Sequence, residues 1–200
     1  DGLPGVALTG LARDASGLFW VAVYGRGLAY GKESFEKYPT LSLPFHDPNS
    51  VLYARAVDAA GNWVFISTAE GLLLLNTKGT PDPSDDGSRI VLEVPTNRVE
   101  FKGDTLYACT DSGLYRVPLE RVLDPGAWER LYSARPVYSV LLGDALLLGT
   151  DDGVRDTANR LLAAESSAVN WLLERGGKVY AATEGAGVWV LDAIAHPIGD

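Results

Sequence analysis

The chain has 200 residues, of which 46% are hydrophobic and 22% are charged, a normal composition for a globular protein with a sizeable core. Its formal net charge of −9 repels phosphate backbones, so we expect no nucleic-acid partner. The apolar runs are far shorter than the roughly 20 residues of a membrane helix, and we expect no membrane insertion of this segment. Cys109 is the single cysteine, which excludes an internal disulfide.

Short runs of β-branched and aromatic residues, separated by Gly and Asp turns, follow one another along the chain. In the first repeat they cover residues 6–13, 19–23, 27–31 and 35–41, with the turn "DASG" at 14–17. The same order predicts repeat units at about 6–45, 46–95, 96–135, 136–166 and 167–200 within one domain, 1–200. A fourth run is not evident in the last unit, where the N-terminal residues 1–8 are the candidate replacement strand.

One position anchors the alignment of the five units, directly before the second turn of each. It is occupied by Val23, Thr68, Thr110, Thr150 and Thr183. A large apolar residue stands three places earlier and is expected to pack between repeats: Trp20, Phe65, Tyr107, Leu147 and Tyr180. The acidic residues after the anchors, Asp111, Asp151, Asp152 and Glu184, are predicted to be turn residues, and the glycine that follows supplies a positive φ.

Four short strands in each unit of about 40 residues are typical of propeller blades. The sequence therefore predicts an all-β fold, a β-propeller of about five four-stranded blades that forms a five-bladed ring or part of a ring of six to eight. Two segments leave alternatives open: residues 157–165 also fit a short helix, and residues 118–131 fit a helical turn before Pro125.

The motif Asp-x-x-Gly-x-x-Trp, followed by apolar residues, Thr, a turn and Gly-Leu, resembles the two-component-regulator propeller repeat. The best copies are "DASGLFWVAVYGRGL" at 14–28 and "DAAGNWVFISTAEGLLLLN" at 58–76. The resemblance implies a β-propeller such as those in the sensor regions of bacterial membrane-bound histidine kinases, in extracytoplasmic binding proteins and in streptogramin-lyase-like proteins. Its recurring residues build the blade, so it implies no catalytic residue.

The first strand of a propeller blade lines the central channel, and the loops that lead into it form a rim where ligands usually bind. The residues expected on this rim are Arg13, Arg55, Arg98, Tyr138, Asn170 and Trp171, with Arg135 and His46 in adjoining loops. Arginine forks match anions and aromatic rings stack on apolar faces, so we expect a small anionic or sugar ligand, or a protein partner. In the alternative reading, these arginines pair with nearby acids and close the channel.

The loop that begins at Asp82 carries oxygen-bearing side chains at calcium-loop spacing. Asp82, Ser84 and Asp86 are the candidate metal ligands, with Gly87 and Glu93 at the later positions of the pattern. The alternative is a solvated acidic hairpin. No other cofactor is expected.

Catalytic constellations are not evident, since the chain has only two histidines, His46 and His196, and no His or Cys cluster. The leading prediction is a non-catalytic ligand- or protein-sensing module of a bacterial signalling or surface protein. We expect it to be extracytoplasmic, periplasmic or secreted, with the cytoplasm as the alternative. A lyase or glycoside-active enzyme on the same fold is the alternative function.

Overall fold

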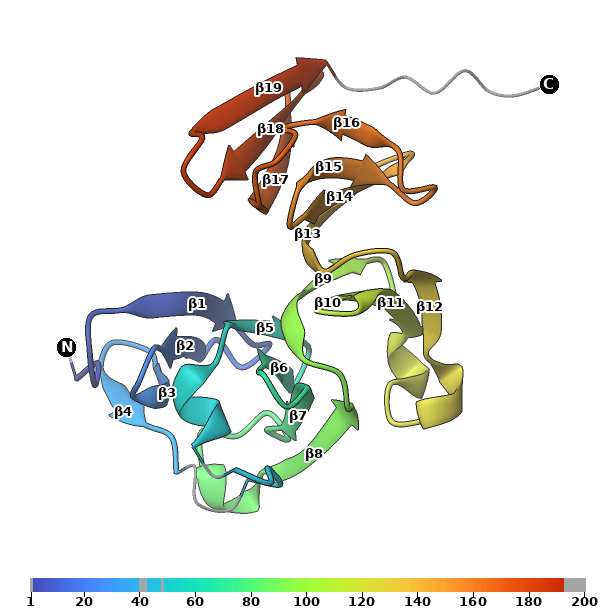
Figure 1. Ribbon diagram of the computed structural model, residues 1–200. Helices are drawn as coiled ribbons and strands as arrows, with labels where there is room; N and C mark the ends of the chain where they lie inside the picture. Colours follow the sequence, from blue (N-terminus) through green and yellow to red (C-terminus); the bar gives the residue numbers. More distant parts are fainter. Residues whose placement is uncertain (1, 40–42, 48, 193–200) are drawn as a thin grey trace. The chain divides into compact units, whose positions relative to one another are not determined.

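A computed structural model describes residues 2–39, 43–47 and 49–192 of the chain, which form five antiparallel sheets in sequence order (Figure 1). Sheet 1 contains β1 (Leu8–Arg13), β2 (Phe19–Val23), β3 (Gly27–Gly31) and β4 (Phe35–Lys37). Sheet 2 contains β5 (Ala56–Ala60), β6 (Trp63–Ser67), β7 (Leu72–Asn76) and β8 (Gly87–Leu92). Sheet 3 contains β9 (Thr96–Lys102), β10 (Thr105–Thr110), β11 (Gly113–Pro118) and β12 (Glu129–Tyr132).

Sheet 4 contains β13 (Val137–Leu142), β14 (Leu146–Thr150), β15 (Gly153–Asp156) and β16 (Leu161–Ala163). Sheet 5 contains β17 (Val169–Arg175), β18 (Lys178–Thr183) and β19 (Val188–Asp192). Each strand pairs with its neighbour in sequence, as predicted for a blade. Short 3₁₀ helices lie between strands: η1 (Ser50–Tyr53), η2 (Pro83–Asp85), η3 (Leu119–Arg121) and η4 (Pro125–Ala127).

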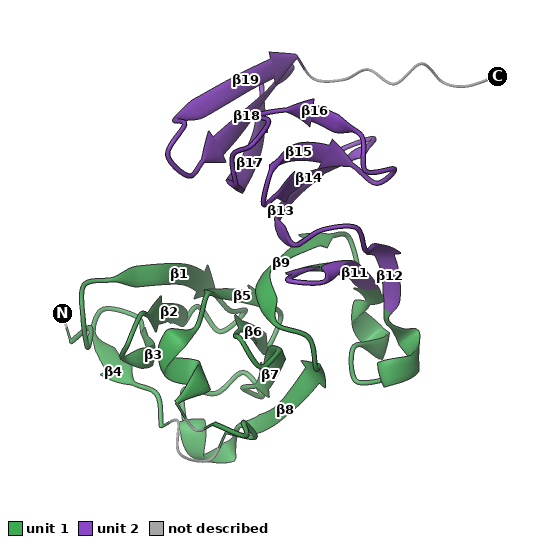
Figure 2. Cartoon of the chain, viewed as in Figure 1, with its two compact units in different colours: residues 1–108, 117–128 green, residues 109–116, 129–200 purple. Residues whose placement is uncertain are grey.

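The chain forms two compact units (Figure 2). The first comprises residues 1–108 and 117–128, and the second comprises residues 109–116 and 129–200. Sheets 1 and 2 belong to the first unit and sheets 4 and 5 to the second, while sheet 3 contributes strands to both. Among the described residues, no helix has the length and apolar character that crossing a bilayer requires.

The anchor threonines close the turn between the second and third strands of their sheets. The side-chain hydroxyls of Thr68, Thr110, Thr150 and Thr183 donate to the carbonyl oxygens of Gly71, Gly113, Gly153 and Gly187 at 2.7 to 2.9 Å. These glycines have φ values between +73° and +145°, a region that side chains with a Cβ rarely occupy. The repeated Thr and Gly are therefore one structural device, in which the hydroxyl fixes a turn that only glycine adopts without strain.

Four of the five large residues three places before the anchors pack into the core, as predicted. Trp20 is 1% exposed and lies in a cluster that joins sheet 1 to Val57, Val64 and Leu73 of sheet 2. Phe65 is fully buried, and its ring centroid lies 5.6 Å from that of Phe101 in sheet 3.

The same position is occupied differently in the later sheets. Leu147 is buried against Leu172 and Val179 of sheet 5. Tyr107 is buried as well, whereas Tyr180 is only half-buried.

Asp14 organises the first turn of sheet 1 and holds Trp20 in place. Its Oδ1 accepts hydrogen bonds from the backbone N–H groups of Ser16 and Leu18 and from the Ser16 hydroxyl at 2.7 to 3.1 Å. Its Oδ2 accepts the indole N–H of Trp20 at 3.0 Å. The Asp and the Trp of the repeat motif are therefore hydrogen-bond partners, and Asp14 is a turn residue, as predicted.

The structure corrects several expected element boundaries. The apolar run at residues 51–57 predicts a strand, but η1 (Ser50–Tyr53) covers its first part and the strand begins at Ala56. Asp58, expected in a turn, lies inside β5 opposite Phe65. Residues 161–163 form β16, as the repeat predicts, and not the alternative helix, and the helical turn expected before Pro125 is present as η3. Pairing of the N-terminal residues with sheet 5 stays a prediction, and His196 lies outside the described residues.

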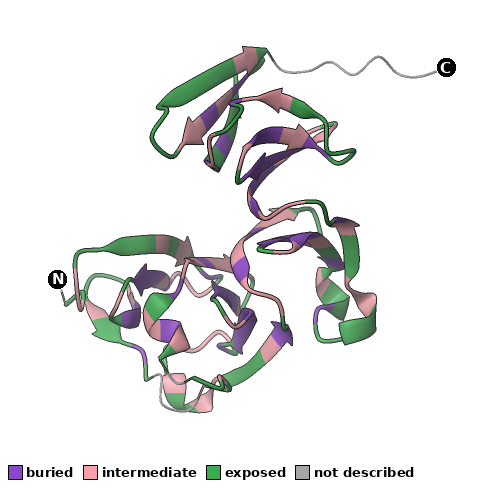
Figure 3. Cartoon of the chain, in the orientation of Figure 1, coloured by how far each residue is buried: buried purple, intermediate pink, exposed green. Residues whose placement is uncertain are grey.

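Sheet 5 carries an exposed apolar face (Figure 3). Trp171, Leu173, Val188 and Val190 are 50% to 63% exposed, and the register places them on the same face as Tyr180. Sheets 1, 2 and 4 bury the large residue of the same repeat position against the sheet that follows. The exposed face of sheet 5 therefore corresponds to the face that sheets 1, 2 and 4 pack against the next sheet.

Candidate functional site

The predicted rim residues occupy both ends of their first strands. Arg55 directly precedes β5, Arg98 is the third residue of β9, Tyr138 is the second of β13, and Asn170 and Trp171 are the second and third of β17. Arg13, in contrast, is the last residue of β1 and pairs with Phe19, beside the first turn. The expectation that Arg13 shares the rim of the others is wrong, because β1 begins at Leu8 and its first end lies five residues earlier.

In the first unit, the rim arginines are held by neighbouring protein groups. Arg55 Nη1 donates to Asn97 Oδ1 at 2.6 Å, and Arg98 Nη2 lies 3.0 Å from Glu100 Oε1. The Arg98 side chain is only 13% exposed. These contacts agree with the alternative in which the arginines pair within the protein. His46 is exposed, and its ring nitrogen Nδ1 lies 3.4 Å from Glu70 Oε2.

Asp58 joins the Arg98 and Glu100 pair from the neighbouring first strand. Burial raises the pKa of Asp58 from 3.8 to about 6, with Arg98 opposing the shift and Glu100 adding to it. Burial also raises the pKa of Glu100, again against the effect of Arg98. The Asp58 carboxyl accepts a hydrogen bond from the Val99 backbone and so links β5 to β9.

Stability is expected to fall as the pH rises through the titration of Asp58. Because its pKa is higher in the fold, at about 6, than the ordinary 3.8, the folded state binds more protons between these values. Asp58→Asn removes this titration, so its unfolding free energy relative to wild type should increase between pH 4 and pH 7, by about 2 to 3 kcal/mol. Urea unfolding of both proteins across this pH range measures the difference in unfolding free energy. A difference that does not change with pH would show that burial does not penalise this carboxylate.

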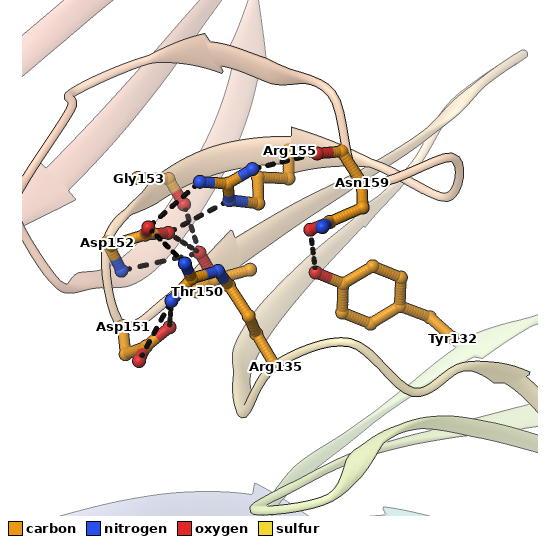
Figure 4. Close-up of polar contacts among 8 residues, drawn as sticks. All are labelled: Tyr132, Arg135, Thr150, Asp151, Asp152, Gly153, Arg155 and Asn159. Atoms are coloured by element: carbon orange, nitrogen blue, oxygen red, sulfur yellow. Dashed lines mark hydrogen bonds and ion pairs between the residues drawn. The ribbon is translucent and has the colours of Figure 1, made fainter.

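In the second unit, Arg135 belongs to a compact ion-pair network (Figure 4). Arg135 Nη2 lies 2.9 Å from Asp152 Oδ2, and Nη1 lies 3.3 Å from Asp151 Oδ1. Arg155 binds the same Asp152 through Nε and Nη2 at 2.9 and 2.8 Å, and this hydrogen bonding is the main cause that lowers the Asp152 pKa. The two guanidinium groups face two carboxylates, so the network fastens the segment before β13 to the turn after β14.

A shallow depression of about 300 Å³ lies beside this network. It is lined by residues 130–134 and 157–159. The Tyr132 hydroxyl donates to Asn159 Oδ1 at 2.6 Å, and Arg155 Nη1 donates to the Asn159 backbone carbonyl at 2.7 Å. The polar groups around Asn159 are thus bonded to one another (Figure 4).

A larger cleft of about 620 Å³ opens in the first unit, at the end of the strands opposite to the predicted rim. One wall is the turn between β5 and β6, residues 60–63. The other wall consists of residues 104–105, between β9 and β10, and residues 118–120, after β11. A volume of this size is within the range of small-molecule sites.

Trp63 forms the aromatic part of the first wall and is held from behind. Its ring meets that of Phe65 edge-on, with centroids 6.4 Å apart and planes at 72°. Phe65 is fully buried and contacts Phe101 in turn. Because the supporting ring cannot move freely in a packed core, the indole is presented in a defined orientation.

The second wall is fixed by a backbone hydrogen bond and an anchored loop. The Leu119 N–H donates to the Asp104 carbonyl at 2.7 Å, and Val122 is fully buried beneath the loop. Asp124 accepts the Gly126 N–H and pairs with Arg121 at 2.7 Å, which directs the Arg121 guanidinium to the loop itself. Residues 119–128 therefore form a connection between β11 and β12 that is fixed by these contacts.

The lining of the cleft carries acidic groups. Asp104 and Glu120 are exposed carboxylates, Asn62 and Thr105 add polar groups, and neither Lys nor Arg is among the described residues of the lining. A neighbouring depression of about 230 Å³ shares Trp63 and is lined further by Leu74, Asn76, residues 87–89 and Leu123. None of these residues was a predicted site residue. The available signal was Trp63, which stands outside the repeat position of Trp20.

The predicted calcium ligands lie on or next to η2, and two of them bond to protein donors. Asp82 Oδ1 accepts the Ser84 N–H at 2.9 Å and caps η2, and this bond is the main cause that lowers its pKa. Asp86 Oδ2 accepts the Tyr38 hydroxyl at 2.7 Å. Among the described residues, no group of three or more His, Cys, Asp or Glu side chains is arranged to hold a metal ion.

Calcium binding stays a prediction, which thermal melting can test. A melting temperature that rises on calcium addition, and falls back with a chelator, would support a site at Asp82, Ser84 and Asp86. Loss of that rise in Asp82→Asn would assign it to this loop. An unchanged melting temperature would remove the site.

The Tyr38 bond to Asp86 is expected to stabilise the first unit. Tyr38 is 3% exposed, and burial, followed by its bond to Asp86, raises its pKa. Tyr38→Phe leaves Asp86 Oδ2 without this donor, so we expect a loss of about 1 to 3 kcal/mol in unfolding free energy. Tyr53→Phe is the matched control, because Tyr53 is 50% exposed and should change stability little. Equal effects of the two substitutions in urea unfolding would contradict this role.

Comparison with known proteins places the fold. No protein-family model and no curated protein matches the chain. Among solved structures, the extracellular domain of BT4673 from B. thetaiotaomicron, described as a hybrid two-component system, matches with a TM-score of 0.65 and 19% identity. The match covers 96% of this chain and 28% of that one. PorZ, a surface component of the type-IX secretion system of Porphyromonas gingivalis, matches with a TM-score of 0.64 and 12% identity over 92% of this chain and 32% of its own.

A third match is the extracellular domain of BT3049, also from B. thetaiotaomicron and described as a hybrid two-component system. Its TM-score is 0.53 at 15% identity, over 96% of this chain and 34% of that one. The chain is a β-propeller. The resemblance to the two-component-regulator propeller repeat is thus confirmed at the level of the fold. The chain spans about a third or less of each of these three structures.

Proposed function

We propose that the chain is a non-catalytic recognition domain of an extracytoplasmic bacterial sensor or surface protein, and that its ligand occupies the cleft beside Trp63. The observation that carries this proposal is the cleft itself, about 620 Å³ in volume, with a supported indole on one wall and polar groups on the other. Pockets of this kind combine an apolar face that supplies affinity with a few polar groups that fix orientation. The extracellular domains of BT4673 and BT3049 support the sensing role and the location.

The rim arginines are less suited to binding a ligand than the sequence predicts, because protein groups already occupy them. Arg55, Arg98 and Arg135 already contact Asn97, Glu100 and Asp152. A ligand at these positions would have to displace those partners, which costs binding free energy. The cleft offers exposed polar groups without that cost.

Nuclear magnetic resonance of the tryptophan indole N–H groups tests the proposal. The chain is titrated with a mixed panel of neutral sugars, amines, amino acids and carboxylates, and Trp63→Phe assigns the Trp63 signal. We expect at least one compound to shift this signal saturably while the signal of Trp189, which is 44% exposed on β19, stays in place. A panel that never moves the Trp63 signal, or that moves both signals equally, would refute a ligand site in this cleft.

A glycoside-active enzyme is the second candidate, because Asp104 and Glu120 line the same cleft and glycosidases use two carboxyl groups. Both residues are exposed, whereas a general acid is normally kept in an apolar pocket. Binding without turnover is therefore the better supported reading. Product formation from aryl glycosides that disappears in Asp104→Asn would favour the enzyme instead.

A further inference from the structure

We infer that the cleft beside Trp63 takes an organic cation, a primary ammonium group carried on an apolar body. This inference rests on the proposed function, since it names the ligand class of the same cleft. The two walls of the cleft differ: one carries carboxylates and the other an indole ring.

The charge of the lining favours a cation. Asp104 and Glu120 stand on the second wall, and the described residues that line the cleft include no Lys or Arg. Arg121, which follows Glu120 in the chain, is paired with Asp124 at 2.7 Å. The whole chain has a net charge of −9, so its long-range field attracts cations and repels anions as well.

The first wall offers what an ammonium group and its apolar body both need. The face of an indole attracts a cation through its quadrupole, and Trp is the best side chain for this contact. The same ring packs against the methylene or aryl part of a ligand. The Phe65 ring supports the Trp63 indole through an edge-on contact, with centroids 6.4 Å apart. Residues 62–63 line the cleft.

The two walls come from separate sheets, so a ligand can contact both at once. A cation placed between them would be met by the indole from one side and by the carboxylates from the other. An anion would meet the carboxylates without any compensating base. A neutral polyol could hydrogen-bond to Asn62, Thr105 and the carboxylates but would gain nothing from the charge.

Three probes of similar shape separate these possibilities: 3-phenylpropylamine, 3-phenylpropanol and 3-phenylpropanoate. They share the aryl body and carry charges of +1, 0 and −1 at pH 7. Binding to the full chain is measured from the Trp63 indole signal. We expect the amine to bind roughly tenfold more tightly than the alcohol and the carboxylate to bind most weakly.

Two double variants with the same change in net charge provide the control. Asp104→Asn/Glu120→Gln should reduce the preference for the amine over the alcohol to about twofold or less. Asp144→Asn/Glu165→Gln alters two exposed acids that do not line the cleft and should leave the preference intact. All four residues are exposed, so both variants are expected to melt near the wild-type temperature, which circular dichroism checks.

Each outcome has a distinct meaning. Alcohol or carboxylate binding as strong as that of the amine would overturn the cationic ligand class while leaving the cleft as a binding site. The class would also fail if both double variants lost the preference equally, since the effect would then arise from net charge. If neither these probes nor the mixed panel moves the Trp63 signal, the proposed function fails together with the ligand class.

Discussion

Trp20→Ala is expected to lower the free energy of unfolding by about 3 to 5 kcal/mol, the range measured for removing large buried aromatic side chains. Trp20 is 1% exposed, stacks on Tyr30 with centroids 5.5 Å apart, and lies in the core between sheets 1 and 2. The substitution leaves a cavity and removes the indole N–H that donates a hydrogen bond to Asp14 Oδ2. Urea unfolding followed by circular dichroism measures the loss.

Two further variants test whether the effect comes from the buried position of Trp20. Trp189→Ala is the matched control, because Trp189 is 44% exposed and its removal should cost less than about 1 kcal/mol. Trp20→Phe keeps an aromatic ring in the core but removes the pyrrole part of the indole with its N–H, so it should cost less than Trp20→Ala, about 1 to 3 kcal/mol. If Trp20→Ala cost no more than Trp189→Ala, Trp20 would not be a core residue of sheets 1 and 2.

Gly113→Ala is the second substitution expected to have a large effect, a loss of about 3 kcal/mol or more. Gly113 has φ +131°, and an added Cβ would overlap the backbone carbonyl of Tyr132 in β12. Backbone cannot move aside as a flexible side chain can, so β11 and β12 would have to separate. The Thr110 hydroxyl bond to the Gly113 carbonyl would be strained by the same movement.

Gly103→Ala in the same sheet is the control for backbone conformation alone. Gly103 has φ +57°, and an added Cβ would meet nothing within 4 Å. The expected loss is therefore about 1 kcal/mol, the strain of alanine in a left-handed turn. Comparable losses for the two variants in urea unfolding would mean that the close approach of β12 contributes nothing.

The fold could be predicted from the sequence because its determinants are local and repeated. Short apolar runs between Gly and Asp turns mark the strands, and the anchor threonine lies only a few residues from the glycine that it fixes. Asp14 and Trp20 are likewise six positions apart and bond directly. The prediction is wrong where a repeat departs from the motif. Asp58 stands at the motif position of Asp14, but it lies within β5 and not in a turn.

The candidate site could not be predicted in the same way. Its walls come from residues 60–63, 104–105 and 118–120, which are far apart in sequence and meet only after two sheets have packed. Propellers usually bind ligands at the loops that lead into the first strands, whereas this cleft lies at the other end of the strands. The pairing of Arg98 with Glu100 and of Arg135 with Asp152 likewise depends on rotamers and register that composition does not reveal.

The threonine and glycine pairs also bear on how the chain reaches its structure. Each pair closes a loop of only a few residues, so its formation costs little chain entropy and needs no distant segment. All-β proteins dominated by distant contacts fold slowly, whereas local hairpins form within microseconds. Each repeat can therefore nucleate independently, and the rate-limiting step is expected to be the docking of one preformed meander on the next.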